Sequence, residues 1–217
     1  MTFEFISSNL PGMTVFAIGK RTNNAQLIAD CAQLGYLRPE WETLDPTYGK
    51  GRFWTNWEPI SLTCSDILGK NDLIGKRYVQ YDDFTELSYE DERFAATVFD
   101  PPYKLNGTST GKGVASSDSS YGVDVPSTWE DRHRLISAGI EECARVTSKI
   151  LLIKCQDQVV SGKKRWQTRV FADVAELQGF ELIDMLHVQG YRPQPEGRRQ
   201  VHSRGDYSTL LVTRKKK

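Results

Sequence analysis

The segment of the chain that is most specific chemically is Asp100-Pro101-Pro102-Tyr103, which follows the apolar run 94–99. Each proline fixes its own φ and lacks a backbone N–H, so the segment holds an acidic side chain and a backbone carbonyl beside an aromatic ring. The Asp100 carboxylate and the Pro101 carbonyl could accept hydrogen bonds from an exocyclic amino group while Tyr103 stacks on the base that bears it. The alternative is a turn that only ends a strand, because Asp-Pro commonly initiates turns.

A second segment, Asp45-Pro46-Thr47-Tyr48-Gly49-Lys50-Gly51, follows the short run 41–44. Its two glycines allow the backbone to bend sharply or to lie close to a ligand. Acidic residues also follow two other candidate strands: Asp66 comes after 60–64, and the neighbours Asp82 and Asp83 come after 78–81. The sequence therefore predicts several carboxylates at the ends of strands.

The elements that would position these residues alternate between strand and helix signals, which is typical of an α/β sheet. Helical spacing of apolar residues predicts helices over 23–34, 127–147 and 166–177; the second would begin with a capping box of Ser127 and Glu130, and Trp166 would be buried on the third. Ligands of open α/β sheets bind at the carboxyl ends of the strands, where the acidic residues lie. Seven strands are predicted: 41–44, 60–64, 78–81, 94–99, 150–155, 180–188 and 207–213.

Residues 104–128 interrupt this alternation with four glycines, six serines and no isoleucine, phenylalanine or methionine. Such a segment buries too little apolar surface to fix itself, so we expect a mobile loop within a single domain spanning 1–217. With 39% hydrophobic residues the chain can form a well-buried core, and no apolar run approaches the roughly 20 residues of a membrane span. The four cysteines lack metal-site spacing and the three histidines are scattered, so we expect a cytoplasmic protein without metal or disulfides.

The formal net charge of zero conceals an asymmetry along the chain. Residues 154–217 carry 13 Lys/Arg against 7 Asp/Glu, whereas residues 1–153 carry 15 against 21. The basic clusters are Lys163-Lys164-Arg165, Arg198-Arg199 and the last four residues. This third of the chain would attract a polyanion, although a solvated surface remains the alternative.

Asp100-Pro101-Pro102-Tyr103, together with the glycine segment upstream, resembles the S-adenosylmethionine-dependent amino-methyltransferases that act on nucleic-acid bases, of which the DNA adenine-N6 and cytosine-N4 enzymes are the best known. The resemblance covers roughly residues 20–213. It implies one Rossmann-like class I methyltransferase domain with a seven-stranded, mostly parallel sheet whose last strand is antiparallel. It also implies transfer of a methyl group to an amino nitrogen, and N6 of adenine in DNA is the favoured acceptor.

The resemblance implies roles residue by residue. The methionine end of the cofactor would be bound by Asp45, Pro46, Thr47, Gly49 and Gly51, its ribose by Asp66, and its adenine by Asp83 with Phe84. The catalytic residues would be Asp100, Pro101, Pro102 and Tyr103. Nucleic acid would be bound by Lys163, Lys164, Arg165, Arg198 and Arg199. Thr47 departs from the family, which often has an aromatic residue there. The chain has no room for a separate target-recognition region, so a homodimer could supply selectivity.

Four alternatives remain open at this stage. They are an RNA base methyltransferase, a cytosine-N4 DNA methyltransferase, a protein-amide methyltransferase and a non-catalytic cofactor-binding subunit. No cysteine is placed to attack a base, which argues against methylation at carbon 5 of cytosine.

Overall fold

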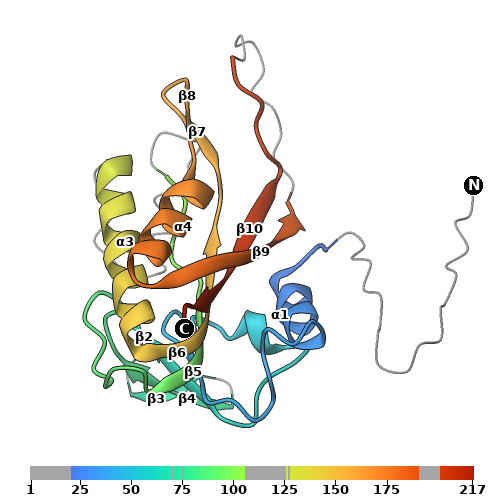
Figure 1. Ribbon diagram of the computed structural model, residues 1–217, viewed down its shortest axis with the longest axis vertical. Coiled ribbons are helices and arrows are strands. Elements are labelled where there is room, and N and C mark those ends of the chain that lie inside the picture. The colour runs from blue at the N-terminus through green and yellow to red at the C-terminus, as the bar shows by residue number, and fades with distance from the viewer. Residues whose placement is uncertain (1–20, 70, 75, 106–125, 127, 191–200) are drawn as a thin grey trace, which may run out of the picture.

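A computed structural model describes residues 21–69, 71–74, 76–105, 126, 128–190 and 201–217. A central sheet has helices on both faces (Figure 1). Helix α1 (Asn24–Gln33) covers one face, and helices α3 (Trp129–Val146) and α4 (Gln167–Leu177) cover the other. This arrangement confirms the predicted α/β class.

Within the part of the chain that the structure describes, the sheet contains eight strands, one more than predicted. Their order is β3 (Asp72–Ile74), β4 (Arg77–Tyr81), β2 (Leu62–Asp66), β1 (Thr43–Asp45), β5 (Phe94–Phe99), β6 (Thr147–Cys155), β10 (Tyr207–Lys215) and β9 (Phe180–Gln189). Strands β4, β2, β1, β5 and β6 are parallel, and β10 runs antiparallel to both of its neighbours, as predicted. The additional strand β3 pairs antiparallel with β4 and has only three residues, too few to give a period-two signal.

A separate hairpin lies outside the main sheet, in a stretch that the sequence analysis treated only as basic. It consists of β7 (Gln158–Val160) and β8 (Lys163–Arg165), which pair antiparallel. The two residues between them, Ser161 and Gly162, have φ values of 49° and 75°. Positive φ at both central positions is typical of the tight hairpin turn that matches the twist of the strands.

The core lies in two layers because the central parallel strands are buried on both faces. Along β6, Leu151 and Ile153 pack with α3 and α4, whereas Ile150 and Leu152 pack with α1. Gly139 allows α3 to approach the sheet closely, since a Cβ there would lie 2.6 Å from ring carbons of Phe84 and Phe99.

Two details of the helices differ from the predictions. Thr128, not Ser127, caps α3, and its hydroxyl oxygen accepts a hydrogen bond from the Asp131 N–H at 3.0 Å. The prediction that Trp166 is buried is wrong: the residue lies at the N-cap of α4 and is 54% exposed. The buried positions of α4 include Phe171 and Gln167, the first residue of the helix. The Gln167 side chain is hydrogen-bonded to backbone groups, so the buried face of α4 begins at Gln167 and not at Trp166.

Within the described residues, no helix is long and apolar enough to cross a membrane, and no cluster of side chains could hold a metal ion. All four cysteines are buried free thiols, and burial raises the pKa of Cys31 and of Cys64 to about 12. Most of the predicted loop 104–128 lies outside the described residues, so its mobility stays a prediction.

Candidate active site

The two segments singled out in the sequence lie side by side at one edge of the sheet. Strands β1 and β5 pair in parallel, with Leu44 opposite Thr97, so their carboxyl ends reach the same edge. The Asp100 N–H donates to the Thr47 hydroxyl at 2.9 Å, which joins the segment after β5 to the loop after β1. The two segments, which the family resemblance links in the sequence, are in direct contact in the structure.

The carboxylate of Asp45 braces the loop that follows it. One oxygen accepts hydrogen bonds from the Thr47 N–H at 3.0 Å and from the Thr47 hydroxyl at 3.3 Å, and the other accepts from the Trp54 indole N–H at 2.7 Å. Burial raises the pKa of Asp45 to about 7. Asp45 therefore fixes the shape of the loop, and contact of Asp45, Pro46 or Thr47 with a cofactor stays a prediction.

The glycine part of this loop is held by the end of β2. The Gly49 N–H donates to one Asp66 carboxylate oxygen at 2.8 Å, while the other oxygen accepts from the Leu68 N–H at 2.9 Å. Gly49 has a φ of 52°, and among the described residues only the Thr47 carbonyl oxygen lies within 4 Å of the position of a Cβ on it, at 3.9 Å. At Gly51 a Cβ would instead collide with the Tyr48 hydroxyl. The open side of Gly49 is therefore where a ligand could lie against the backbone.

At the end of β4, the two adjacent acids have different surroundings. Asp82 is buried, and its carboxylate accepts a hydrogen bond from the Ser88 hydroxyl at 3.0 Å. Asp83 is partly exposed, and its carboxylate accepts from the Thr85 N–H and hydroxyl, both at 2.8 Å. Asp83 is thus the more accessible of the two. The Phe84 ring lies in the core, edge-on to Phe99 with ring centroids 5.2 Å apart.

Asp100 is the most unusual group at this edge. Its Oδ1 atom is buried and has no hydrogen-bond partner among the described residues. Burial raises the pKa of Asp100 to about 6, and the charge of Lys154 acts in the opposite direction. A buried acceptor without a partner is rare in native proteins and marks a place where a ligand can donate.

Lys154 was not singled out in the sequence, although a lysine inside the apolar run 150–155 is itself a signal. Phe99 lies opposite Ile153 in the β5–β6 pairing, so Asp100 and Lys154 follow as the next pair. Lys154 is fully buried, and its ammonium group donates to the side-chain oxygen of Asn24 at 2.6 Å. Burial lowers the pKa of Lys154, while Asp100 raises it. A buried cation therefore accompanies the buried carboxylate.

Two buried glutamines, also missed by the sequence analysis, hold the backbone that follows Asp100. The Tyr103 N–H donates to the Pro101 carbonyl at 2.7 Å, which closes a tight turn. The Tyr103 carbonyl accepts from the side-chain amides of Gln158 at 2.9 Å and Gln167 at 2.8 Å, and the Gln158 oxygen accepts from the Leu105 N–H at 3.2 Å. We call Gln158 and Gln167 the glutamine clamp.

The predicted nucleic-acid-binding residues fall into different environments. Lys163 is exposed at the hairpin, and the Lys164 ammonium lies 5.0 Å from the ring centroid of Trp166. Arg165 stacks on Trp129, with its guanidinium carbon 3.7 Å from the ring centroid and its Nε atom buried. Arg198 and Arg199 lie outside the described residues.

No protein-family profile and no curated protein sequence matches the chain. Among solved structures, magnesium protoporphyrin IX methyltransferase from Synechocystis PCC 6803, with bound S-adenosylmethionine, is similar with a TM-score of 0.51 at 12% identity, over 88% of this chain and 77% of the other. A proposed RNA methyltransferase from Pyrococcus horikoshii has a TM-score of 0.53 at 14% identity, over 89% and 83% of the two chains. The [4+2]-cyclase SpnF has a TM-score of 0.52 at 15% identity, over 88% and 80%.

These similarities, with the observed strand order, show that the chain has the Rossmann-like fold of class I methyltransferases. The fold prediction is confirmed, except that the sheet has eight strands. Because a cyclase shares the fold, the fold alone does not define the reaction, which has to be inferred from the residues of the site.

Proposed function

We propose that this protein is an S-adenosylmethionine-dependent methyltransferase that modifies an exocyclic amino nitrogen of a nucleic-acid base, with N6 of adenine in DNA as the first candidate. The observation that carries the proposal is the buried Oδ1 of Asp100, which has no partner among the described residues and lies in a corner fixed by two prolines. A carboxylate held in this way suits an amino group, because an amino group is a hydrogen-bond donor.

The loop after β1 fits the proposed cofactor. Gly49 leaves open space beside the backbone, and Asp66 fixes the loop from the end of the next strand. Gly49, Gly51 and Asp66 would hold S-adenosylmethionine, with Asp83 as the residue nearest to its adenine. When bound, S-adenosylmethionine supplies an electrophilic methyl group. Magnesium protoporphyrin IX methyltransferase, which has this fold, was solved with that molecule bound, which supports the choice.

The chain's own groups would orient the amino nitrogen rather than attack it. The Asp100 carboxylate would accept one amino N–H, and the Pro101 carbonyl, which already accepts from Tyr103, has a second lone pair for the other. Holding both N–H bonds fixes the direction of the nitrogen lone pair, so positioning supplies most of the rate. The four buried thiols, whose pKa values are raised by burial, offer no thiolate nucleophile, which supports amino over carbon methylation.

The test is to incubate the protein with DNA or RNA and S-adenosylmethionine carrying an isotopically labelled methyl group, then to digest the nucleic acid and identify the labelled nucleoside by mass spectrometry. We expect labelled N6-methyldeoxyadenosine. Label on N4 of deoxycytidine, or on a ribonucleoside, would move the proposal to the corresponding alternative. Protein that binds the cofactor yet labels neither nucleic acid would contradict the proposed function.

A further inference from the structure

The β7–β8 hairpin leaves the sheet at the edge where Asp100 lies. It follows β6, which is parallel to β5, so both strands end at that edge. Because β10 is antiparallel to β6, its first residue, Tyr207, is also at this edge. The hairpin and residues 201–206, which lead into β10, extend side by side from this end of the molecule (Figure 1). The Lys164 ammonium, 3.4 Å from the Ser203 carbonyl, links the two projections.

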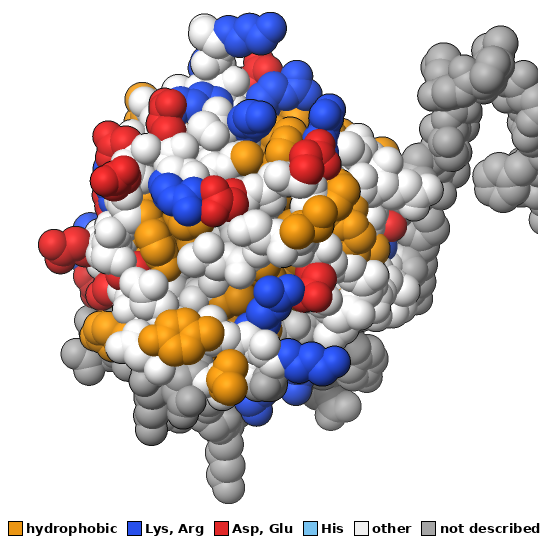
Figure 2. Space-filling view, turned by 90° about the horizontal axis from the view of Figure 1, so that it is seen from below, with side chains coloured by type: hydrophobic (Ala, Val, Ile, Leu, Met, Phe, Trp, Pro, Cys, Tyr) orange, Lys and Arg blue, Asp and Glu red, His pale blue; other side chains and the backbone are white. Residues whose placement is uncertain are grey.

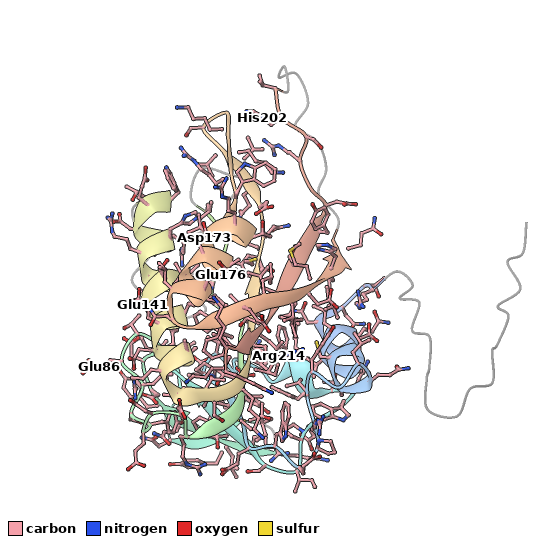
Figure 3. All side chains as sticks on the ribbon, viewed as in Figure 1. Glu86, Glu141, Asp173, Glu176, His202 and Arg214 are labelled. Carbon is pink, nitrogen blue, oxygen red and sulfur yellow. The ribbon has the colours of Figure 1, made fainter. Side chains whose placement is uncertain are left out.

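An aromatic side chain and positive charges gather on this projection. Trp166 is 54% exposed, which is unusual for so large a ring, and the Lys164 ammonium lies close to its π face. Residues 163–169 include four basic residues and no acidic one. Figure 3 places His202 at the tip of this end, whereas the acidic Glu86 and Glu141 lie on the side of α3 farther from it.

The opposite end of the molecule differs. Seen from below, Lys and Arg side chains are interspersed with Asp, Glu and apolar side chains (Figure 2). Among the described residues, that face therefore presents no large patch of one sign. Near the hairpin, the four basic residues of 163–169 can attract an anionic chain to the edge that carries Asp100. The basic residues Arg214 and Lys215 lie at the other end, where β10 finishes.

The same projection is tied to the catalytic corner. Trp166 directly precedes Gln167, and Gln158 begins the first strand of the hairpin. These two glutamines are the clamp that donates to the Tyr103 carbonyl at 2.8 and 2.9 Å. Both ends of the hairpin are thus fixed relative to Tyr103, so a group bound on Trp166 would lie at a set position from Asp100.

We propose that Trp166 and Lys164 form a stacking platform for an unpaired base of DNA that neighbours the target base, with Lys163 and Lys164 facing its phosphates. This inference rests on the proposed function. Proteins bind single-stranded nucleic acid with exposed aromatic rings beside lysines, because every base has a π face that can stack on a ring and every phosphate is anionic. Arg165, between Lys164 and Trp166 in the sequence, is stacked on Trp129 of α3.

The experiment measures binding of a fluorescent single-stranded DNA oligonucleotide by anisotropy, at several salt concentrations, with S-adenosylmethionine affinity measured by calorimetry in parallel. We expect Trp166→Ala to weaken DNA binding about 5- to 150-fold, Trp166→Phe to weaken it less, and both to keep the cofactor affinity of the parent. Lys164→Gln should make DNA binding less dependent on salt. Tyr78→Ala is the matched control, since Tyr78 is 58% exposed but lies near the start of β4, away from this edge.

The outcomes separate the platform from the proposed function. If the parent methylates DNA and Trp166→Ala binds DNA as tightly as Tyr78→Ala does, the platform is wrong and the proposed function stands. If the parent binds and methylates no nucleic acid, both are wrong. If RNA binds in a Trp166-dependent manner and DNA does not, the assignment of the platform to DNA is overturned.

Discussion

At the residue scale, the acidic side chains of the site act in two ways. The carboxylates of Asp45 and Asp66 accept hydrogen bonds from the glycine loop and fix its shape. Asp100 instead keeps a buried oxygen without a partner among the described residues, beside the buried Lys154. Keeping a charged acceptor unbonded in the absence of ligand costs folding free energy, as is common at functional sites.

This cost predicts a pH-dependent effect of Asp100→Asn on stability. The folded pKa of Asp100, about 6, lies above the ordinary value of 3.8, so its ionisation destabilises the fold. The loss grows as the pH rises from about 4 to 6, is complete above pH 6, and is absent below pH 4. The charge of Lys154 reduces this cost, while the charge of Asp100 adds to the effect of burial in raising the pKa of the neighbouring Asp45. Urea unfolding should therefore show Asp100→Asn more stable than the parent at pH 8, by at most about 3 kcal/mol, and not at pH 4.

The control for this prediction is Glu141→Gln, the same change of acid to amide at an exposed position of α3. We expect the control to show no comparable gain at pH 8. An Asp100→Asn variant that loses equal stability at both pH values would show that Asp100 is a structural turn residue.

A second prediction at this scale concerns Gly49. Gly49→Val should abolish S-adenosylmethionine binding in calorimetry, because the side chain would fill the open space beside the loop. Gly35→Val is the control: Gly35 also has a positive φ, 79°, and open space around its Cβ position, but it follows α1 away from the loop. Backbone strain affects both variants, so undiminished cofactor affinity in Gly49→Val would refute the loop's assignment.

The sequence predicted this site unevenly, for physical reasons. Asp100, the glycine loop and Asp66 follow strands, and parallel strands end at one edge, so their proximity was predictable. Lys154 could not be placed beside Asp100 without the β5–β6 register, which local patterns do not determine. The glutamine clamp was missed because a glutamine is ordinarily a surface residue, and only the tertiary structure brings the Tyr103 carbonyl to it.

At the scale of elements, the strands were predicted better than the face of the last helix. The run 94–99 matches β5, because a central strand buried on both faces is continuously apolar. In α4, the predicted apolar stripe consists of Trp166, Val170, Phe171, Val174 and Leu177. Phe171 is buried and Val174 packs against the core, but Trp166 and Leu177 at the two ends are 54% and 84% exposed. The deciding residue is Gln167, whose buried amide is held by backbone groups of other segments.

The clamp therefore predicts a large effect of Gln167→Leu. The change removes the side-chain oxygen that accepts from the Gln156 N–H, at a cost of about 1–3 kcal/mol. It also removes one of the two donors to the Tyr103 carbonyl, which keeps its bond from Gln158. Urea unfolding should show this loss of stability. Gln178→Leu, at the exposed C-terminal end of α4, is the control and should change little. Equal stability of both variants would mean that the glutamine clamp does not contribute to the free energy of unfolding.

At the scale of the whole molecule, one end of the sheet combines three features: the glycine loop, the Asp100 corner and the basic hairpin. The parallel strands β1, β5 and β6 place these features there, because their carboxyl ends lie at the same edge. Since β10 is antiparallel to β6, the beginning of β10 lies at that edge as well. Binding of a polyanion, the formation of a homodimer and the mobility of residues 104–128 stay predictions. Cofactor, target base and flanking strand would meet at this edge.

The most direct test of the central claim separates chemistry from cofactor binding in Asp100→Ala. If Asp100 orients an amino group that only the substrate carries, the variant should bind S-adenosylmethionine nearly as well as the parent while transfer of the labelled methyl group to DNA falls by orders of magnitude. Calorimetry and label incorporation, measured on the same protein preparation, give both quantities. Near-normal methylation by Asp100→Ala would contradict the account, as would a loss of cofactor affinity in step with the loss of activity.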